Sequence, residues 1–276
     1  MIGFKMKNYL NYWKLQESIF TKNITGDHIY LSTGMRRNYY TFYNSIPIKL
    51  QLLLIDGSFA VGKSTFAKSF YWKLNEDRLN TIMINPHTKT LKPGWFFSQI
   101  NQKIIGSEYK KGSYLYQIQG LGLSHQYLKD NKKHIIIFCD KANYLLEGRC
   151  KDELELFFNF QASNGFYFTL ILIDTNIYEN IIKQNNLSHF VTKRLNIPVL
   201  STNEMKDYIL WYISKSTITY NPFSHDALEI IANHSKGNLY KTNNLCEILL
   251  VIAAKENLES INADFVKNII SQNQLV

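Results

Sequence analysis

Residues 57–64 read Gly57-Ser-Phe-Ala-Val-Gly-Lys-Ser64, a complete G-x-x-x-x-G-K-[ST] motif. Its glycines let the backbone wrap with the N–H groups pointing inward, so that the loop forms a nest for phosphate groups. In such a loop Lys63 reaches the β- and γ-phosphates of a nucleoside triphosphate, and the hydroxyl of Ser64 contacts Mg²⁺. The stretch therefore predicts a P-loop that binds ATP or ADP together with Mg²⁺.

The sequence on both sides of the motif fits this prediction. Residues 51–56 form a short apolar run of the kind found in buried strands, and residues 65–74 have helical spacing. The phosphates would then meet the N-terminus of a helix. The alternative is a glycine turn that happens to precede a lysine. The expected nucleotide contacts are the loop residues Gly57, Ser58, Phe59, Ala60, Val61, Gly62, Lys63, Ser64 and Thr65.

A carboxylate suited to the magnesium shell follows a second apolar run. Residues 135–140 read Ile-Ile-Ile-Phe-Cys-Asp, and an aspartate at the end of a strand near a P-loop holds the metal shell of many ATPases. We therefore expect Ser64 and Asp140 to bind Mg²⁺ and Asp140 to belong to the nucleotide site. The alternative is an aspartate that caps the following turn. The next residue is Lys141, and a cation cannot act as the base that activates water.

Composition narrows the class of protein. The chain has 276 residues, of which 45% are hydrophobic, and this suffices for a large core. No apolar run reaches the ~18 residues of a membrane span, and the start of the chain lacks a signal-peptide core. With three widely spaced cysteines, these features predict a cytoplasmic protein with reduced thiols. The net charge of +9 permits an acidic partner, although a lysine-rich solvated surface is the simpler explanation.

Apolar runs and helical patterns alternate through the middle of the chain. Strands are expected at residues 51–56, 81–85, 134–139, 167–173 and 191–199, and helices at 65–74, 93–105 and 114–129. Continuous apolar strands between helices predict a parallel sheet covered on both faces. After residue 200 only helices are expected, at 201–212, 224–233, 242–255 and 262–271, the first opened by a Ser-x-x-Glu capping box. The fold class is thus α/β, followed by a small all-helical domain.

The order of these motifs resembles AAA+ ATPases of the ExeA/GspA type, from the general secretion pathway, and their relatives among transposition ATPases (MuB, TniB, TnsC). Residues 140–145 are similar to that family's D-E-A-x-x-L, and residues 235–246 resemble its S-x-G-x-P-R-x-I-N-x-L-C. Residues 200–209 look like its P-L-S…Y-I lid entry, residues 172–176 stand where its sensor-1 strand ends, and residues 12–20 and 28–32 look like its N-terminal lead-in.

The resemblance implies a P-loop AAA+ fold in three parts. These are a lead-in at residues 1–48 that packs on the ATPase core, the α/β nucleotide-binding domain at 49–200 and a helical lid at 201–276. It also implies catalytic roles for Lys63, Asp140 and Thr175, the last as the polar sensor-1 residue.

Three departures from the family pattern affect catalysis. The Walker B glutamate is Lys141, the sensor-2 arginine falls on Tyr240, and the Q-R that would carry an arginine finger reads His189-Phe190. Arg194 lies four residues later and is the remaining candidate for the finger. An arginine finger supplies roughly 10³–10⁵ in rate, so its loss together with the glutamate predicts weak or absent hydrolysis.

We therefore expect an ATP-binding AAA+ protein that acts through nucleotide-dependent conformation or assembly in a secretion or envelope-associated complex. It would work with a protein partner as a homo- or hetero-oligomer, in the cytoplasm or at the inner face of the membrane through that partner. The alternatives are an active ATPase with Arg194 as finger, a DNA-binding ATPase of the transposition type, and a small-molecule kinase.

Two further stretches carry weaker hypotheses. The aromatic run at residues 37–43 could stack on adenine, but core packing is the simpler explanation. The loop at residues 106–112, with Lys110 and Lys111, could face a ring pore or DNA, although an ordinary surface loop explains it as well.

Overall fold

The computed structural model describes residues 9–20, 29–45, 50–77, 80–88, 90–146, 150–183 and 186–272. Its contacts divide the chain into two compact units. Unit 1 comprises Met1–Thr33, Phe59–Gly62 and Pro198–Val276, and unit 2 comprises Gly34–Ser58 and Lys63–Ile197. Residues 1–8, and His28 of the expected lead-in, lie outside the described residues.

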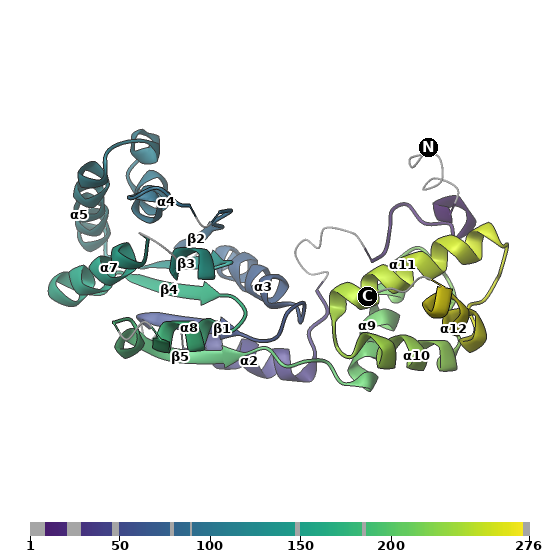
Figure 1. Cartoon of the computed structure of the whole chain (residues 1–276). Coiled ribbons are helices and arrows are strands. Elements are labelled where there is room, and N and C mark those ends of the chain that lie inside the picture. Colours follow the sequence, from purple (N-terminus) through teal and green to yellow (C-terminus); the bar gives the residue numbers. More distant parts are fainter. Residues whose placement is uncertain are drawn as a thin grey trace. The chain divides into compact units, whose positions relative to one another are not determined.

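Unit 2 is built on a five-stranded sheet in which every pairing is parallel, with the order β2-β3-β4-β1-β5 (Figure 1). The strands are β1 (Leu52–Asp56), β2 (Asn80–Ile84), β3 (Ile135–Asp140), β4 (Phe168–Ile173) and β5 (Val191–Asn196). β1, β3 and β4 are buried almost throughout, because helices cover both faces of the sheet. Their continuous apolar sequence is the consequence of this double burial.

Helices connect the strands, as parallel pairing requires. The helices of unit 2 are α2 (Thr33–Tyr43), α3 (Lys63–Glu76), α4 (Trp95–Ile104), α5 (Tyr114–Asp130), α6 (Asn143–Leu146), α7 (Cys150–Asn164) and α8 (Ile177–Lys183), with 3₁₀ turns η2 (Ser107–Lys110) and η3 (Ser188–Phe190). The carboxyl ends of all five strands lie at one edge of the sheet, and in open α/β sheets ligands bind outside that edge.

Alternate residues of the strands face two different sets of helices. One face forms a core cluster in which strand residues such as Leu54 and Ile137 join Phe96 and Phe157 from α4 and α7. On the other face the ring of Tyr71 from α3 packs edge-on against Phe138 of β3, at 6.0 Å between ring centroids. β1, β3 and β4 therefore bury both of their faces between helices, whereas the edge strands β2 and β5 are partly exposed.

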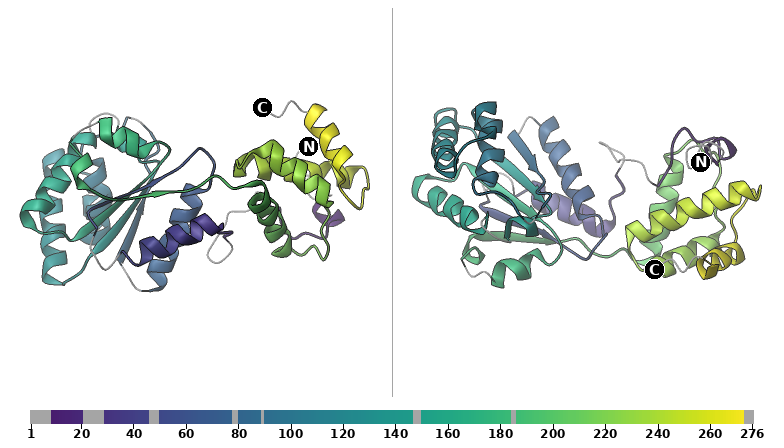
Figure 2. Two further views of the ribbon diagram at one scale, coloured as in Figure 1. Left: turned by 90° about the horizontal axis from the view of Figure 1, so that it is seen from below. Right: turned by 45° about the horizontal axis from the view of Figure 1, so that its top comes forward.

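Unit 1 has its own core, formed chiefly by α9 (Thr202–Ser214), α10 (His225–Ser235), α11 (Leu239–Lys255) and α12 (Ala263–Gln272) (Figure 2). α9 opens with the expected capping box, because the side chain of Ser201 accepts from Glu204 N and the carboxylate of Glu204 accepts from Ser201 N. α11 begins three residues earlier than expected, because Asn238 accepts from Lys241 N at 2.9 Å and caps the helix there.

The two described segments of the N-terminal lead-in pack in different units. The side chains of Tyr9, Trp13 and Phe20 are buried in the core of unit 1, and Trp13 Nε1 donates to Leu250 O at 2.9 Å. α2, by contrast, belongs to unit 2. This differs from the expectation that residues 1–48 pack together on the ATPase core. The apolar side chains of the first segment are part of the core of the helical unit.

Candidate nucleotide site

The P-loop motif joins a buried strand to a helix, as its sequence predicts. β1 ends at Asp56, and α3 begins at Lys63. Gly57 and Gly62 have φ values of 147° and 95°, in the region that favours glycine. The loop between them therefore needs these two glycines to turn from the strand into the helix, and its end meets the helix N-terminus, where free N–H groups attract anions.

Lys63 is buried and ties the loop to the end of β4. Its Nζ atom donates to Gly57 O at 2.8 Å, to Ser58 O at 2.7 Å and to Thr175 Oγ1 at 2.8 Å. Burial lowers the pKa of Lys63, and the charges of Asp174, Asp56 and Asp140 oppose that shift. The fold thus brings together two of the predicted catalytic residues, Lys63 and Thr175, which lie 112 residues apart in the sequence.

The two predicted magnesium ligands also lie side by side. Ser64 Oγ donates to Asp140 Oδ1 at 2.8 Å, and the same oxygen accepts from Lys141 N at 3.1 Å. Mg²⁺ in nucleotide sites usually takes one or two protein oxygens, with waters and phosphate oxygens completing its shell. A hydroxyl and a carboxylate in contact fit that demand. In the described part of the chain no group of three or more His, Cys, Asp or Glu side chains could hold a metal by itself.

Lys141 stands at the position of the Walker B glutamate and is exposed. Its φ of 59° lies in the left-handed region, which non-glycine residues adopt rarely. Asp140 Oδ1 accepts its backbone N–H, which holds this turn at the end of β3. The structure therefore puts an ammonium group, and not a carboxylate, directly after Asp140, the predicted magnesium ligand.

Two further carboxylates at the same edge of the sheet escaped the sequence analysis. Asp56 ends β1, and Asp174 follows Ile173, the last residue of β4. Both end the tripeptide Leu-Ile-Asp, at 54–56 and at 172–174, and Asp140 ends a similar apolar run. This repeat of an apolar strand that ends in aspartate was the available signal. Parallel strands bring such ends to one edge of the sheet.

Asp56 is paired within the chain by Arg194. Arg194 Nη2 lies 3.0 Å from Asp56 Oδ2, and its guanidinium carbon lies 4.3 Å from the ring centroid of Tyr178. Asp56 also accepts from Gly57 N at 2.7 Å. The candidate for an arginine finger is therefore held at the end of its own sheet, on β5, by an ion pair and a cation–π contact.

Two further positions that the family resemblance singled out, His189-Phe190 and Tyr240, lie in η3 and α11. His189 and Phe190 lie in η3, where Phe190 is buried and stacks on Phe158 at 4.8 Å between centroids. Tyr240 is the second residue of α11, and 64% of its surface is exposed. Phe190 thus belongs to the core, and the position that the resemblance assigns to the sensor-2 arginine carries an exposed phenol.

The two weaker hypotheses also have structural outcomes. In α2, Tyr39 stacks on Phe70 at 4.0 Å and Phe42 meets the same ring edge-on at 4.5 Å, so these side chains pack against α3 as core residues. Lys110 ends η2, Lys111 follows it, and both are exposed. The segment at 106–112 is therefore a partly helical surface loop that displays two cations.

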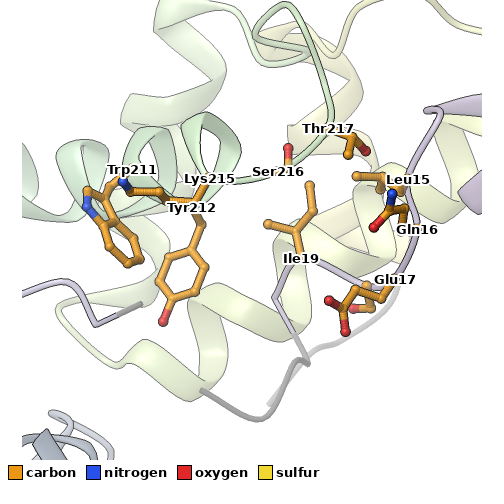
Figure 3. Close-up of a pocket in the computed structure, with 10 residues that line it drawn as sticks. Leu15, Gln16, Glu17, Ile19, Trp211, Tyr212, Lys215, Ser216 and Thr217 are labelled. Atoms are coloured by element: carbon orange, nitrogen blue, oxygen red, sulfur yellow. The ribbon is translucent and has the colours of Figure 1, made fainter. Parts of the chain in front are cut away.

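A separate cavity of about 150 Å³ lies within unit 1 (Figure 3). Residues 15–19 line one side, and the last turn of α9 with the residues after it lines the other, including Trp211, Tyr212 and Lys215. None of the predicted nucleotide contacts lines it. Its single carboxylate, from Glu17, and its single ammonium, from Lys215, give it no preferred ligand charge.

Comparison with solved structures identifies the fold. The chain is similar to Drosophila ORC in a structure bound to DNA, with a TM-score of 0.75 and 11% identity over 96% of this chain and 65% of that one. It is similar to the Aeropyrum pernix ORC2 protein, solved in ADPNP–ADP complexes, with a TM-score of 0.72 and 13% identity over 94% of this chain and 72% of that one. The chain has the AAA+ fold.

Further AAA+ neighbours extend this likeness. Thermotoga maritima RuvB matches with a TM-score of 0.61 and 14% identity over 88% of this chain and 70% of that one. No protein-family model and no curated protein sequence matches the chain. The chain spans less than two thirds of the length of the ORC chain from Drosophila. In the part of the chain that the structure describes, no helix has the length and apolar character to cross a bilayer.

Proposed function

We propose that this chain binds ATP with Mg²⁺ at the P-loop and hydrolyses it weakly. The observation that carries the proposal is the arrangement of Lys63, Ser64, Asp140 and Thr175, which come from three segments and contact one another in pairs at 2.8 Å. Lys63 would bind the β- and γ-phosphates, and Thr175 would contact the terminal phosphate. The loop amides of residues 57–62 and Thr65 would complete the nucleotide contacts. Ser64 and Asp140 would hold Mg²⁺, which neutralises charge on the phosphates when bound.

The prediction of weak hydrolysis is supported by the groups around that arrangement. Lys141 occupies the position of the usual water-orienting carboxylate. Arg194 is engaged by Asp56 and Tyr178, so that a role as a finger toward another subunit would break an existing ion pair. Tyr240 lacks the charge of a sensor-2 arginine. Since a finger alone is worth roughly 10³–10⁵ in rate, we infer a slow enzyme whose nucleotide acts mainly as a ligand.

A ligand that binds one conformation can control that conformation without rapid chemistry. A ligand that binds only one state stabilises it by about 4 kcal/mol at a concentration 1,000-fold above its Kd. We propose that ATP binding in this way sets a conformation, or an assembly with itself or with another protein. The ExeA/GspA-like motifs favour a secretion or envelope-associated complex, reached from the cytoplasm or at the inner face of the membrane through a partner.

DNA binding is the second candidate function, and two observations favour it. Neighbours of this fold include ORC proteins in complexes with DNA, and the chain carries a net charge of +9. Lys110 and Lys111 are two of the exposed cations that could contact phosphate groups. This would make the chain similar in role to the transposition ATPases.

Retention of radiolabelled ATP tests the leading proposal. The pure protein is mixed with ATP and Mg²⁺, and bound nucleotide and released phosphate are measured separately. We expect retention with slow release, and loss of retention in Lys63→Ala, while Lys68→Ala on the exposed side of α3 retains ATP like the wild type. Equal retention by both variants, or none by the wild-type chain, would refute the proposal.

Salt dependence tests whether DNA is a ligand of this chain. If DNA is a ligand, the logarithm of its affinity falls linearly with the logarithm of salt concentration. The double variant Lys110→Ala, Lys111→Ala should then reduce the slope, because each lost phosphate contact lowers it by about one. An absence of DNA binding at physiological salt, with and without ATP, would remove this candidate.

A further inference from the structure

The register of the sheet puts a carboxylate beside the residue that replaces the Walker B glutamate. β3 and β4 pair in parallel with Asp140 opposite Ile173. One residue further along each strand are Lys141 and Asp174. β1 and β4 pair with Ile55 opposite Ile173, so the same step puts Asp174 beside Asp56 on its other side. Asp174 therefore lies between the end of β3 and the start of the P-loop.

Backbone groups hold the carboxylate of Asp174 in place. Its Oδ2 atom accepts from Asn143 N at 2.9 Å, and its Oδ1 atom accepts from Thr175 N at 2.7 Å. Asn143 is itself fixed, because its Nδ2 donates to Thr175 O at 3.0 Å and its Oδ1 accepts from Asn180 Nδ2 at 2.9 Å. Each carboxylate oxygen keeps lone-pair capacity after these single bonds. The group is oriented and remains able to accept another hydrogen bond.

Asp174 is also electrostatically close to the residue that would bind the terminal phosphates. Thr175, the next residue, accepts from Lys63 Nζ. Of the three carboxylates that oppose the lowering of the pKa of Lys63, Asp174 has the largest effect. The other two have partners that occupy them: Asp56 is paired with Arg194, and Asp140 accepts from Ser64 Oγ, its proposed fellow ligand for Mg²⁺.

We propose that Asp174 is the catalytic base of this chain and takes the role that Lys141 cannot fill. The inference rests on the proposed ATP site. Asp174 orients a water molecule toward the γ-phosphorus of ATP and accepts its proton while the new oxygen–phosphorus bond forms. The bond between the γ-phosphorus and the β,γ-bridging oxygen breaks, and its electron pair leaves with ADP. The products are ADP and inorganic phosphate, and the proton passes from Asp174 to solvent.

Substitution of Asp174 by asparagine separates this role from a structural one. Asparagine keeps one oxygen, which can accept one of the two turn hydrogen bonds, and it cannot take up a proton. Its amide donor then faces the other backbone N–H, so a modest loss of stability is expected whatever the role of Asp174. We expect Asp174→Asn to retain ATP as tightly as the wild-type chain. We expect it to release phosphate at least about 100-fold more slowly, in line with the usual contribution of a general base. The matched control is Asp207→Asn, an exposed aspartate of α9, which should leave both quantities unchanged.

A second variant tests whether the two neighbouring positions can exchange the role. Lys141→Glu restores a carboxylate directly after Asp140. In the Asp174→Asn background it should raise the rate of phosphate release at least tenfold above that of Asp174→Asn alone. If Asp174 serves only to hold the turn at Asn143, Lys141→Glu will not recover the activity of this background. That result would overturn the inference.

Fluoride analogues give a readout that does not depend on turnover. ADP with beryllium fluoride imitates bound ATP, whereas ADP with aluminium fluoride imitates the transition state, in which the attacking water is in line. Thermal stabilisation by the first should be equal in the wild type and Asp174→Asn, and the extra stabilisation by the second should vanish in Asp174→Asn. Equal effects of aluminium fluoride, or equal phosphate release, would refute the role of Asp174. Failure of the wild-type chain to retain ATP would instead refute the proposed function.

Discussion

Arg194 Nη2 lies 3.0 Å from Asp56 Oδ2 and links β5 to the end of β1, immediately before the P-loop. The side chain of Asp56 is 5% exposed and that of Arg194 is 42% exposed, so one member of the pair is buried and the other is partly solvated. Asp56 also accepts from the first amide of the P-loop, Gly57 N. The pair therefore ties the geometry of the loop to the edge strand of the sheet.

Loss of the guanidinium should destabilise the fold and should not merely slow the chemistry. Arg194→Ala leaves the Asp56 carboxylate buried without its cation. Since Arg194 is partly solvated, we expect a loss of about 1–3 kcal/mol, below the 3–5 typical of fully buried pairs. Urea unfolding followed by circular dichroism measures it, with Arg37→Ala, an exposed arginine of α2, as the control. A finger acting on another subunit would leave stability unchanged and lower turnover by ~10³–10⁵.

Removal of the charge of Lys63 should have opposite effects on the free and the ligated protein. Burial lowers the pKa of Lys63, so the folded state disfavours the charged form, and this cost is present at neutral pH and relieved as pH rises toward its ordinary pKa. Lys63→Met removes the charge and should raise the free energy of unfolding of the nucleotide-free protein. The same variant should lose the stabilisation by ATP, about 4 kcal/mol at 1,000-fold excess over Kd.

Thermal unfolding with and without ATP and Mg²⁺ measures both effects of Lys63→Met. A variant that is less stable than the wild type without nucleotide would show that the three hydrogen bonds of Lys63 Nζ, together with the three neighbouring carboxylates, stabilise the folded state more than burial of the charge penalises it. A variant that keeps the ATP-dependent shift would show that Lys63 is not the phosphate contact.

The capping box of α9 should contribute measurably to the stability of unit 1. The side chain of Ser201 accepts from Glu204 N and its backbone N–H donates to Glu204 Oε2 at 3.0 Å. Ser201→Ala removes the first of these bonds and should cost about 1 kcal/mol, whereas Ser201→Gly should cost only a few tenths. Chemical unfolding of the two variants side by side checks the ranking. Equal stabilities would mean that other contacts hold the start of α9.

Glu153 should make stability depend on pH in the opposite sense to an ordinary salt-bridged carboxylate. It is buried and accepts from Gly94 N at 2.6 Å and Phe96 N at 3.2 Å, at the start of α4. Burial raises its pKa, and these backbone hydrogen bonds oppose the shift. Above the ordinary value of 4.5 the folded state then binds more protons than the unfolded state, so the contribution of Glu153 to stability falls as pH rises through that window.

Glu153→Gln lacks this titration and provides the comparison. The wild-type chain should be the more stable near pH 4, because glutamine turns an amide donor toward one of the two backbone donors. Its advantage should shrink as pH rises toward neutrality. Unfolding free energies of both proteins at several pH values test this, and an advantage that grows with pH would contradict it.

Much of the fold follows from patterns that a single physical cause produces. Strands buried on both faces must be apolar throughout, and this is why the runs that became β1, β3 and β4 could be predicted to within two residues. The start of α9 could be predicted because a capping box satisfies specific N–H groups. α7 is not among the expected helices, although its buried apolar residues Leu154, Phe157 and Phe158 stand at helical spacing.

The parts of the site that the sequence did not reveal depend on neighbours distant in the chain. That Asp174 stands beside Lys141 follows from the register of β3 on β4. Both strands are apolar on both faces, so their sequences lack the alternation that would otherwise indicate the register. The pairing of Arg194 with Asp56 likewise depends on β5 joining the far side of β1. The packing of Tyr9 and Trp13 into the helical core depends on contacts with residues far along the chain, such as Leu250, which lies 237 residues after Trp13.

Lys63 is saturated before any anion arrives. All three of its protons already have acceptors, Gly57 O, Ser58 O and Thr175 Oγ1. An entering polyphosphate therefore exchanges bonds at this ammonium group and adds none, and the net gain arises from the formal charge that replaces neutral oxygens. The affinity for different nucleotides should therefore depend on the negative charge that their phosphates bring to Lys63 Nζ. With adenosine or its monophosphate, Lys63 Nζ would keep its hydrogen bonds to Gly57 O, Ser58 O and Thr175 Oγ1. A longer phosphate chain would replace these acceptors with charged phosphate oxygens.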